Sequence, residues 1–253
     1  MRLQTIRAMC VAGLVLAAAV ALTVASRAAE TAKKIKVLLV TGDDVGAHPW
    51  PEVSQAIKGI LTGAGRFDVR VCEDPGVLES ASSLGRYDLI FLQMYNFSTP
   101  TLSPTAKANL LDFVRGGKGF ALAHLSSAAF KEWDDFHALV GRYWVMGASG
   151  HGQRGVFKAH IADKDNPVTQ GLEDFEADDE LYAKLQGDAP IHVLVEADSD
   201  YSHKTEPLAW TLSYGQGRVF HETFGHDGKA LKNPALQKLI QRGCEWAATG
   251  KVE

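Results

Sequence analysis

Cysteine is scarce in this chain, which has three among its 253 residues. One of them, Cys10, lies in an apolar N-terminal stretch, and the sequence predicts that Cys72 lies in a strand and Cys244 in a helix. A reactive thiol needs a partly exposed, electropositive setting, so these positions argue against cysteine catalysis. A disulfide between Cys72 and Cys244 stays open, because sequence does not give the distance between their Cα atoms, and two separate buried thiols are the simpler expectation.

Clusters of lysine and arginine are also missing beyond residue 36. The formal net charge is −4, and loss of residues 1–29 would remove three arginines and no acid, which changes it to −7. A protein without a basic cluster has little attraction to phosphate backbones, so we expect no nucleic-acid partner. A hydrophobic content of 46% with 22% charged residues is typical of a folded globular domain.

An uncharged, mostly apolar stretch covers residues 8–25 and follows Arg2 and Arg7, and small residues come after it in "ASRAAE". This is the layout of a secretory signal peptide. We predict a signal peptide over 1–29, one domain over 30–253, and a secreted or periplasmic protein without membrane contact after cleavage. The alternative is an uncleaved anchor, because eighteen uncharged positions just reach the length of a membrane span.

Strand and helix patterns alternate in the first half of the remaining chain. Continuous apolar runs predict buried strands, helical spacing of apolar residues predicts helices, and Ser103 followed by Pro104 is a typical helix start. The predicted strands cover 37–40, 67–73, 87–94 and 119–123, and the predicted helices cover 52–65 and 102–117. This alternation favours an α/β fold with a mainly parallel sheet and helices on both faces.

The second half of the chain is less regular. Strand patterns cover 155–163 and 191–197, a hairpin pattern covers 207–224, and a final helix is predicted to begin after Asn233 as its N-cap. No repeat or linker interrupts this part, so it belongs to the same predicted domain.

Ligands of open parallel sheets bind beyond the carboxyl ends of the strands. Polar side chains follow several predicted strands at this edge, and those chosen as candidate site residues are Asp44, His48, Tyr95, His124, Ser126, His226 and Asp227. One histidine such as His124 could equally be a buried residue that hydrogen-bonds to backbone. Three histidines at separate strand ends instead favour shared proton transfer or a metal.

Several loop residues are further candidates for substrate contacts. His151 lies between glycines that would allow close approach of a ligand, although such glycines also build simple turns. Glu180 follows two other acids and comes just before Tyr182, so this segment is either a solvated loop or a binding site for sugar hydroxyls. Trp50 and Trp144 fall in predicted loops and could stack on a ring.

Two further chemistries can be weighed from spacing. A serine hydrolase is disfavoured, because the nucleophile elbow needs G-x-S-x-G and Ser126 lies in "AHLSSA". A divalent metal such as zinc could be held by His48, His124 and His226, provided that their loops converge. No two of these histidines have the close spacing of a specific zinc motif, so the metal stays an open alternative.

Four segments together resemble the trehalose-utilisation, ThuA-like family: "VLLVTGDDVGAHPWP", "LLDFVRGGKGFALAHLSSAAF", "SGHGQRGVFKAHIADKDNPVTQGLEDFEADDELY" and "PLAWTLSYGQGRVFHETFGHD". The resemblance implies a flavodoxin-like three-layer sandwich related to class I glutamine amidotransferases. Those relatives carry a catalytic cysteine on the turn where this chain has His124, so glutamine hydrolysis through a thioester is excluded. The implied pocket residues are His48, His124, His151, Glu180, His226 and Asp227.

The resemblance also implies a small-molecule carbohydrate as the ligand. The leading hypothesis is an exported enzyme that acts on a carbohydrate or keto-sugar by acid/base hydrolysis or elimination. His124 and His226 would transfer protons, Asp227 would orient His226, and Glu180 with His48 would contact hydroxyls or a metal. The alternative is a non-catalytic sugar-binding module that works with a partner enzyme, and the chain could form a homo-oligomer.

Overall fold

The computed structural model describes residues 33–97 and 101–253, and the segment from Ile35 to Glu253 forms one compact unit. The predicted signal peptide over 1–29 and Cys10 lie outside the described residues. Within those two ranges, no helix is both long and apolar enough to cross a membrane. Cys72 and Cys244 are separate free thiols, as expected, and Cys244 is buried, whereas Cys72 is half-buried and not buried as expected.

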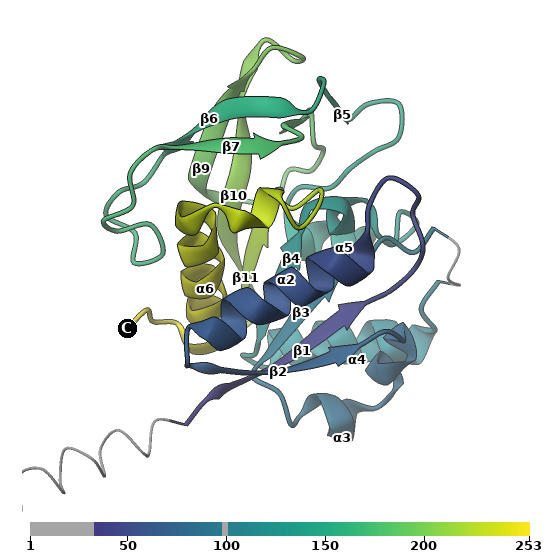
Figure 1. Ribbon diagram of the computed structural model, residues 1–253. Helices are drawn as coiled ribbons and strands as arrows, with labels where there is room; N and C mark the ends of the chain where they lie inside the picture. The colour runs from purple at the N-terminus through teal and green to yellow at the C-terminus, as the bar shows by residue number, and fades with distance from the viewer. Residues whose placement is uncertain (1–32, 98–100) are drawn as a thin grey trace, which may run out of the picture. The chain divides into compact units, whose positions relative to one another are not determined.

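One sheet of nine strands forms the centre of this unit (Figure 1). Five strands are parallel, in the order β2-β1-β3-β4-β11, which is the flavodoxin-like order 2-1-3-4-5. Their bounds are Ile35–Thr41 for β1, Phe67–Cys72 for β2, Leu89–Gln93 for β3, Gly119–Ala123 for β4 and Gly217–Glu222 for β11. The predicted fold class is confirmed.

The sheet continues beyond β11 as an antiparallel extension, in the order β10-β9-β6-β7. These strands cover Lys204–Tyr214, His192–Ser199, Gly155–Ile161 and Phe175–Asp179. Two short strands, β5 at Gly150–His151 and β8 at Tyr182–Ala183, pair separately. Glu180 directly follows β7, so the antiparallel extension positions this residue.

Helices cover both faces of the parallel strands (Figure 1). α2 (Trp50–Gly63) and α6 (Pro234–Thr249) pack on the face that presents Val37 and Leu39. The opposite face, with Leu38 and Val40, is covered by α3 (Ala81–Leu84), α4 (Pro104–Arg115) and α5 (Asp134–Val140). Three 3-10 turns complete the fold: η1 (Pro75–Glu79), η2 (His124–Ala128) and η3 (Ala230–Lys232).

The helix ends follow the sequence signals. Ser103 Oγ accepts a hydrogen bond from Ala106 N at the start of α4, and Asn233 Oδ1 caps α6, as predicted. Helix α6 lies unusually near β11 at Gly243, where an added Cβ would come within 2.5 Å of the Phe220 ring. Trp50 differs from its predicted loop position, because it is the first residue of α2.

Candidate functional site

Four side chains from separate parts of the chain meet at the carboxyl edge of the parallel strands. His48 comes from the loop after β1, His124 begins η2 after β4, and His226 follows β11. Glu180 follows β7 of the antiparallel extension. One potential ligand atom from each lies within 4.8 Å of the others. We call His48, His124, Glu180 and His226 the histidine–glutamate cluster.

The three imidazole rings lie in mutual contact. Their centroids are separated by 4.7 Å between His48 and His226, 5.2 Å between His48 and His124, and 5.8 Å between His124 and His226. The structure therefore brings together the three histidines that were predicted to follow strands at this edge of the sheet. Three protonated imidazoles at this separation would repel one another, so the arrangement favours rings that are neutral or bound to a shared cation.

His124 has a specific orientation. Its backbone φ of 43° lies in the left-handed region, so the chain turns sharply out of β4 at a conformation that costs energy for a non-glycine residue. The side chain is 0% exposed, and its Nδ1 lies 2.7 Å from the carbonyl oxygen of Thr223. Because a carbonyl only accepts, the Nδ1 atom carries the hydrogen. In the neutral ring the lone pair is then on Nε2.

Nε2 of His124 faces the rest of the cluster. Its neighbours are the hydroxyl of Tyr182 at 3.1 Å and Glu180 Oε2 at 3.4 Å. Tyr182 is buried, and burial raises the pKa of its hydroxyl well above the ordinary value. The neutral phenol can therefore donate a hydrogen bond to the neutral imidazole.

Glu180 is the negative charge of the cluster. Its Oε2 lies 3.2 Å from His226 Nδ1, and its Oε1 lies 3.6 Å from His151 Nε2. Burial acts to raise the pKa of Glu180, but the contact with His124 and the nearby rings of His151 and His226 lower it to about 2. The carboxylate is therefore ionised at neutral pH.

His48 is held in the neutral form. Burial and the nearby rings of His124 and His226 lower its pKa to about 4, although Glu180 opposes this shift. Among the described residues, Nδ1 of His48 is buried without a hydrogen-bond partner, whereas Nδ1 of His226, which is also buried, has the Glu180 carboxylate at 3.2 Å. Buried polar nitrogens without partners are uncommon and call for an explanation such as an ion.

These observations test whether the cluster fits a metal. It offers up to three imidazole nitrogens and one ionised carboxylate oxygen, a donor set that suits first-row divalent metals such as zinc or manganese. The second ring nitrogen of His124 is fixed by a backbone carbonyl, the usual support for a metal-binding histidine. The residues therefore fit a divalent metal, with Glu180 added to the three predicted histidines.

Asp179 supports the cluster from behind, and sequence reasoning missed it. The side chain is 1% exposed. Its Oδ1 accepts hydrogen bonds from the backbone N–H groups of Glu180 at 2.8 Å and His226 at 3.2 Å, and its Oδ2 accepts one from Gly225 at 2.7 Å. One carboxylate thus joins the end of β7 to the loop after β11. The alternation of Phe175, Ala177 and Asp179 on the buried face of β7 was the available signal.

Asp227 differs from its predicted part. Its Oδ2 lies 2.8 Å from Arg154 Nη1, and its Oδ1 accepts a hydrogen bond from Ala230 N. Burial opposes ionisation, but the Ala230 N–H and the Arg154 charge lower the pKa of this carboxyl. The carboxylate that lies 3.2 Å from a His226 ring nitrogen is that of Glu180. Asp227 therefore holds Arg154 and the turn after His226, and its predicted part in orienting the imidazole falls to Glu180.

Other candidate residues lie outside the cluster. Ser126 is 0% exposed, and its hydroxyl donates to Leu92 O and accepts from Met94 N, so it joins β3 to η2 and has no surface left for a substrate. Trp50 Nε1 donates to Asp44 Oδ1 at 2.8 Å, which ties these two residues to each other.

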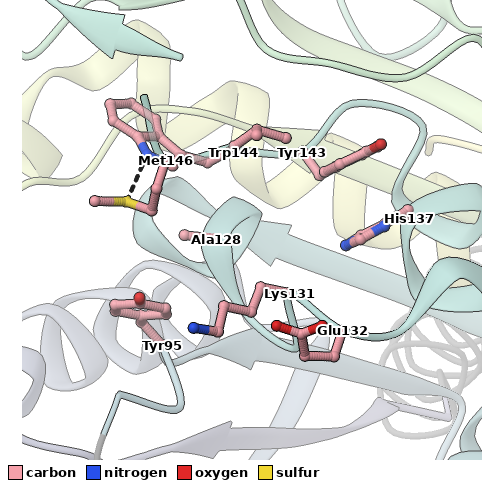
Figure 2. A pocket seen from close by; sticks show the side chains of 9 residues that line it. Tyr95, Ala128, Lys131, Glu132, His137, Tyr143, Trp144 and Met146 are labelled. Atoms are coloured by element: carbon pink, nitrogen blue, oxygen red, sulfur yellow. Dashed lines mark hydrogen bonds between the residues drawn. The ribbon is translucent and has the colours of Figure 1, made fainter. Parts of the chain in front are cut away.

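Aromatic side chains form a wall beside the cluster. The ring of Tyr182 lies 4.3 Å from that of His124 and 4.7 Å from that of Trp144. His151 stacks on Tyr182 at 5.9 Å. Tyr95 does not reach this wall and instead lines a separate cavity together with Trp144 (Figure 2).

The family follows from the sequence match. A family model described as ThuA, trehalose utilisation, matches residues 36–247. The chain belongs to the ThuA family. The match extends from β1 into α6, so every residue of the histidine–glutamate cluster lies inside the ThuA domain. No curated protein matches the chain.

Solved structures agree with ThuA membership. A ThuA-like protein from Parabacteroides merdae is 29% identical with a TM-score of 0.75, over 87% of this chain and 92% of that one. Another from Bacteroides uniformis is 16% identical with a TM-score of 0.69, over 88% and 94%. A protein from Salmonella typhimurium described as cytoplasmic is 15% identical with a TM-score of 0.62, over 85% and 100%. The last two likenesses show the fold alone.

Proposed function

We propose that this ThuA-family chain is an enzyme that acts on a carbohydrate or keto-sugar by acid/base hydrolysis or elimination. The histidine–glutamate cluster, with a bound divalent metal, would be its active centre. One observation carries the proposal: four donor side chains from four chain segments lie within 4.8 Å of one another. A purely structural cluster would have no use for a buried imidazole nitrogen without a hydrogen-bond partner, such as Nδ1 of His48.

The chain's own residues supply acid/base groups in this proposal. The Nδ1–H group of His124 donates a hydrogen bond to the carbonyl oxygen of Thr223, so Nε2 is the atom that takes up and returns a proton. The Tyr182 hydroxyl, 3.1 Å away, stabilises that nitrogen in its neutral form. His226, whose ring is partly exposed and lies next to ionised Glu180, would be the second proton carrier where no metal is bound and a metal ligand where one is.

The two reactions differ in which proton is moved. In hydrolysis, one group removes a proton from the attacking water and another gives a proton to the departing oxygen. In elimination, the base removes a proton from the carbon next to the keto group, and the departing oxygen again receives one. A bound divalent metal would polarise the keto oxygen or lower the pKa of a bound water. His48, Glu180 and His226 would hold it, which leaves the lone pair of His124 Nε2 free to move a proton.

A sugar-binding module is the second candidate, and the aromatic wall of Trp144 and Tyr182 favours it. Stacking on aromatic rings would then carry the affinity. Replacement of Trp144 by alanine would weaken binding of the sugar, while His124→Ala would change it little. In the enzyme, His124→Ala instead lowers turnover by about a hundredfold or more.

Metal content and turnover test the enzyme proposal. We expect elemental analysis of untagged protein to find about one divalent metal per chain, and Glu180→Gln and His226→Ala to reduce both metal content and activity on disaccharides and their keto forms. His192→Ala is the matched control, because His192 is exposed and its ring pairs with Asp163, which is not part of the cluster. Full activity of both cluster variants on the true substrate would refute the proposal.

Export is also part of the proposal, on the strength of the apolar stretch over residues 8–25. Mass measurement of the protein recovered from outside the cytoplasm should give a chain that begins near residue 30. Recovery of the full-length chain from the cytoplasm alone would contradict export.

A further inference from the structure

Four cationic side chains line one groove at the edge of the sheet. The groove has a volume of about 580 Å³ and lies along β2, the last strand of the sheet on that side (Figure 1). Its lining residues are Lys36, Lys58, Asp68, Val69, Arg70, Val71, Arg86 and Tyr87. They come from β1, α2, β2 and the segment between α3 and β3, so the sequence alone shows no basic cluster here. We call this space the basic edge groove.

The cations of the basic edge groove have no partner among the described residues. The side chains of Arg70 and Arg86 form no hydrogen bond and no ion pair there, and those of Lys36 and Lys58 form none either. All other described arginines have such partners: Arg66, Arg115, Arg142, Arg154, Arg218 and Arg242. The one acid of the lining, Asp68, pairs in register with Lys36. Four cations against one carboxylate leave the groove positive, whereas the whole chain has a formal net charge of −4.

An open strand edge runs along the basic edge groove. Within the described ranges, β2 pairs with β1 on one side and with no strand on the other. Four consecutive residues of this strand, 68–71, line the groove. The outer side of an edge strand presents a row of backbone N–H and C=O groups without strand partners. A ligand in the groove therefore meets backbone donors and backbone acceptors as well as the four cations.

The open edge and the positive charge together favour an acidic peptide over a phosphate polymer. A peptide in extended conformation offers donors and acceptors that match those of β2, and its carboxylates pair with guanidinium groups such as those of Arg70 and Arg86. A phosphate chain carries acceptors and negative charge but no comparable row of donors. It would therefore place negative oxygens against the carbonyl groups of β2, which also carry partial negative charge.

The charge of the groove also selects among the strands that could pair with β2. Charged side chains on an edge strand discourage pairing with other strands. When most of them are positive, they repel a basic strand or a second copy of the same groove, and they attract an acidic strand. Val69 and Val71 are half-buried and alternate with the exposed Asp68 and Arg70. A strand beside β2 would continue this alternation, so the matching segment has apolar residues on one face and acidic residues on the other.

We propose that the basic edge groove binds an extended acidic segment of a partner protein, which adds to the sheet as a strand beside β2. Backbone hydrogen bonds to β2 would hold the segment, and its carboxylates would pair with Arg70 and Arg86. The proposal does not depend on the proposed function, because no residue of the histidine–glutamate cluster lines the groove. It concerns a partner protein and leaves the substrate of the cluster unchanged.

Fluorescence anisotropy with the purified chain and a labelled peptide of alternating glutamate and valine tests the proposal. One comparison peptide has lysine in place of glutamate, and another keeps the glutamates but is methylated at every backbone nitrogen, which removes the donors. We expect saturable binding of the acidic peptide, and binding of both comparison peptides that is at least about tenfold weaker. Amide hydrogen exchange should also slow in β2 when the acidic peptide is bound, because outward N–H groups gain partners.

Charge variants locate the binding site. The double variant Arg70→Gln, Arg86→Gln should weaken the acidic peptide at least about tenfold and leave thermal stability unchanged, because both side chains are exposed and have no partner among the described residues. Lys204→Gln, Lys238→Gln is the matched control, since it removes the same charge from exposed positions outside the groove and should bind as the wild type does.

Four results would overturn the proposal. They are the absence of saturable binding of the acidic peptide, equal binding by the groove variant and the control variant, equal binding of the methylated and unmethylated peptides, and tighter binding of inorganic polyphosphate than of the acidic peptide. The third result would replace strand addition by attraction of charge alone, and the fourth would assign the groove to a phosphate ligand.

Discussion

Replacement of Asp179 by asparagine tests how the histidine–glutamate cluster is held together. The buried carboxylate accepts three backbone N–H bonds, two of them from the cluster residues Glu180 and His226. Asparagine has the same shape but only one acceptor oxygen, and its amide group would face a backbone N–H that is also a donor. Either the bond to Gly225 or the pair to Glu180 and His226 must be lost.

The hydrogen bonds of Asp179 set the expected loss of folding stability and of metal affinity in this variant. Hydrogen bonds to a charged acceptor contribute about 1.5–3 kcal/mol each, and a buried donor left without a partner adds its own cost. Because the Asp179 side chain is 1% exposed, Asp179→Asn should lower the free energy of unfolding by about 2–4 kcal/mol. Displacement of Glu180 and His226 should also weaken metal binding about 10–100-fold, the usual cost of losing a supporting contact.

Two measurements on the same samples check this prediction. Urea unfolding of metal-free protein gives the stability, and titration with zinc or manganese in competition with a chelator gives the affinity. Asp198→Asn is the matched control, because Asp198 is exposed and bonds to the Thr205 side chain, and it should change stability by less than about 0.5 kcal/mol. Unchanged stability and metal affinity in Asp179→Asn would refute this account of the carboxylate.

Four further variants test the fold around the site. Gly243→Ala should destabilise the protein by about 1–3 kcal/mol in thermal unfolding, because the added Cβ would lie 2.5 Å from the Phe220 ring. The added Cβ of Gly59→Ala on α2 would meet nothing within 4 Å, so this variant should stabilise the protein by about 0.5–1 kcal/mol. Asn233→Ala removes the α6 cap and should cost about 1 kcal/mol, and a cost near zero would show that the cap is unimportant. Burial lowers the pKa of His221 to about 3, so between pH 6.5 and 3 the unfolded chain binds a proton that the folded chain does not, and stability falls as the pH falls. His221→Gln should reduce that slope by about 1.4 kcal/mol per pH unit between pH 4 and 6, and an unchanged slope would contradict the assignment.

Local patterns predicted most of the parallel half of the fold. The runs in β1, β3 and β4 are apolar at nearly every position because both faces of these strands are covered, and such runs are visible without a structure. Strand β7 was missed, since "EADD" is typical of a solvated loop. Its pairing with β6 depends on contacts between distant residues, which a single sequence does not encode locally.

The site was predicted in its histidines and less well in its carboxylates. His48, His124 and His226 each follow a parallel strand, and the carboxyl ends of such strands share one edge. The direction of a carboxylate depends instead on which donors surround it. Arg154 holds Asp227, and the backbone amides of Gly225 and His226 hold Asp179, and these partners are more than 40 residues away in the chain, where spacing does not reveal them.

The origin of Glu180 has a consequence for how the centre is built. Three imidazoles are supplied by the parallel strands, but the carboxylate comes from β7, the last strand of the antiparallel extension. Neither portion of the sheet alone holds a full donor set, so the centre comes into being only when both have folded and joined. A change in the turn after β7 would replace the carboxylate of Glu180 and leave the three imidazoles in place.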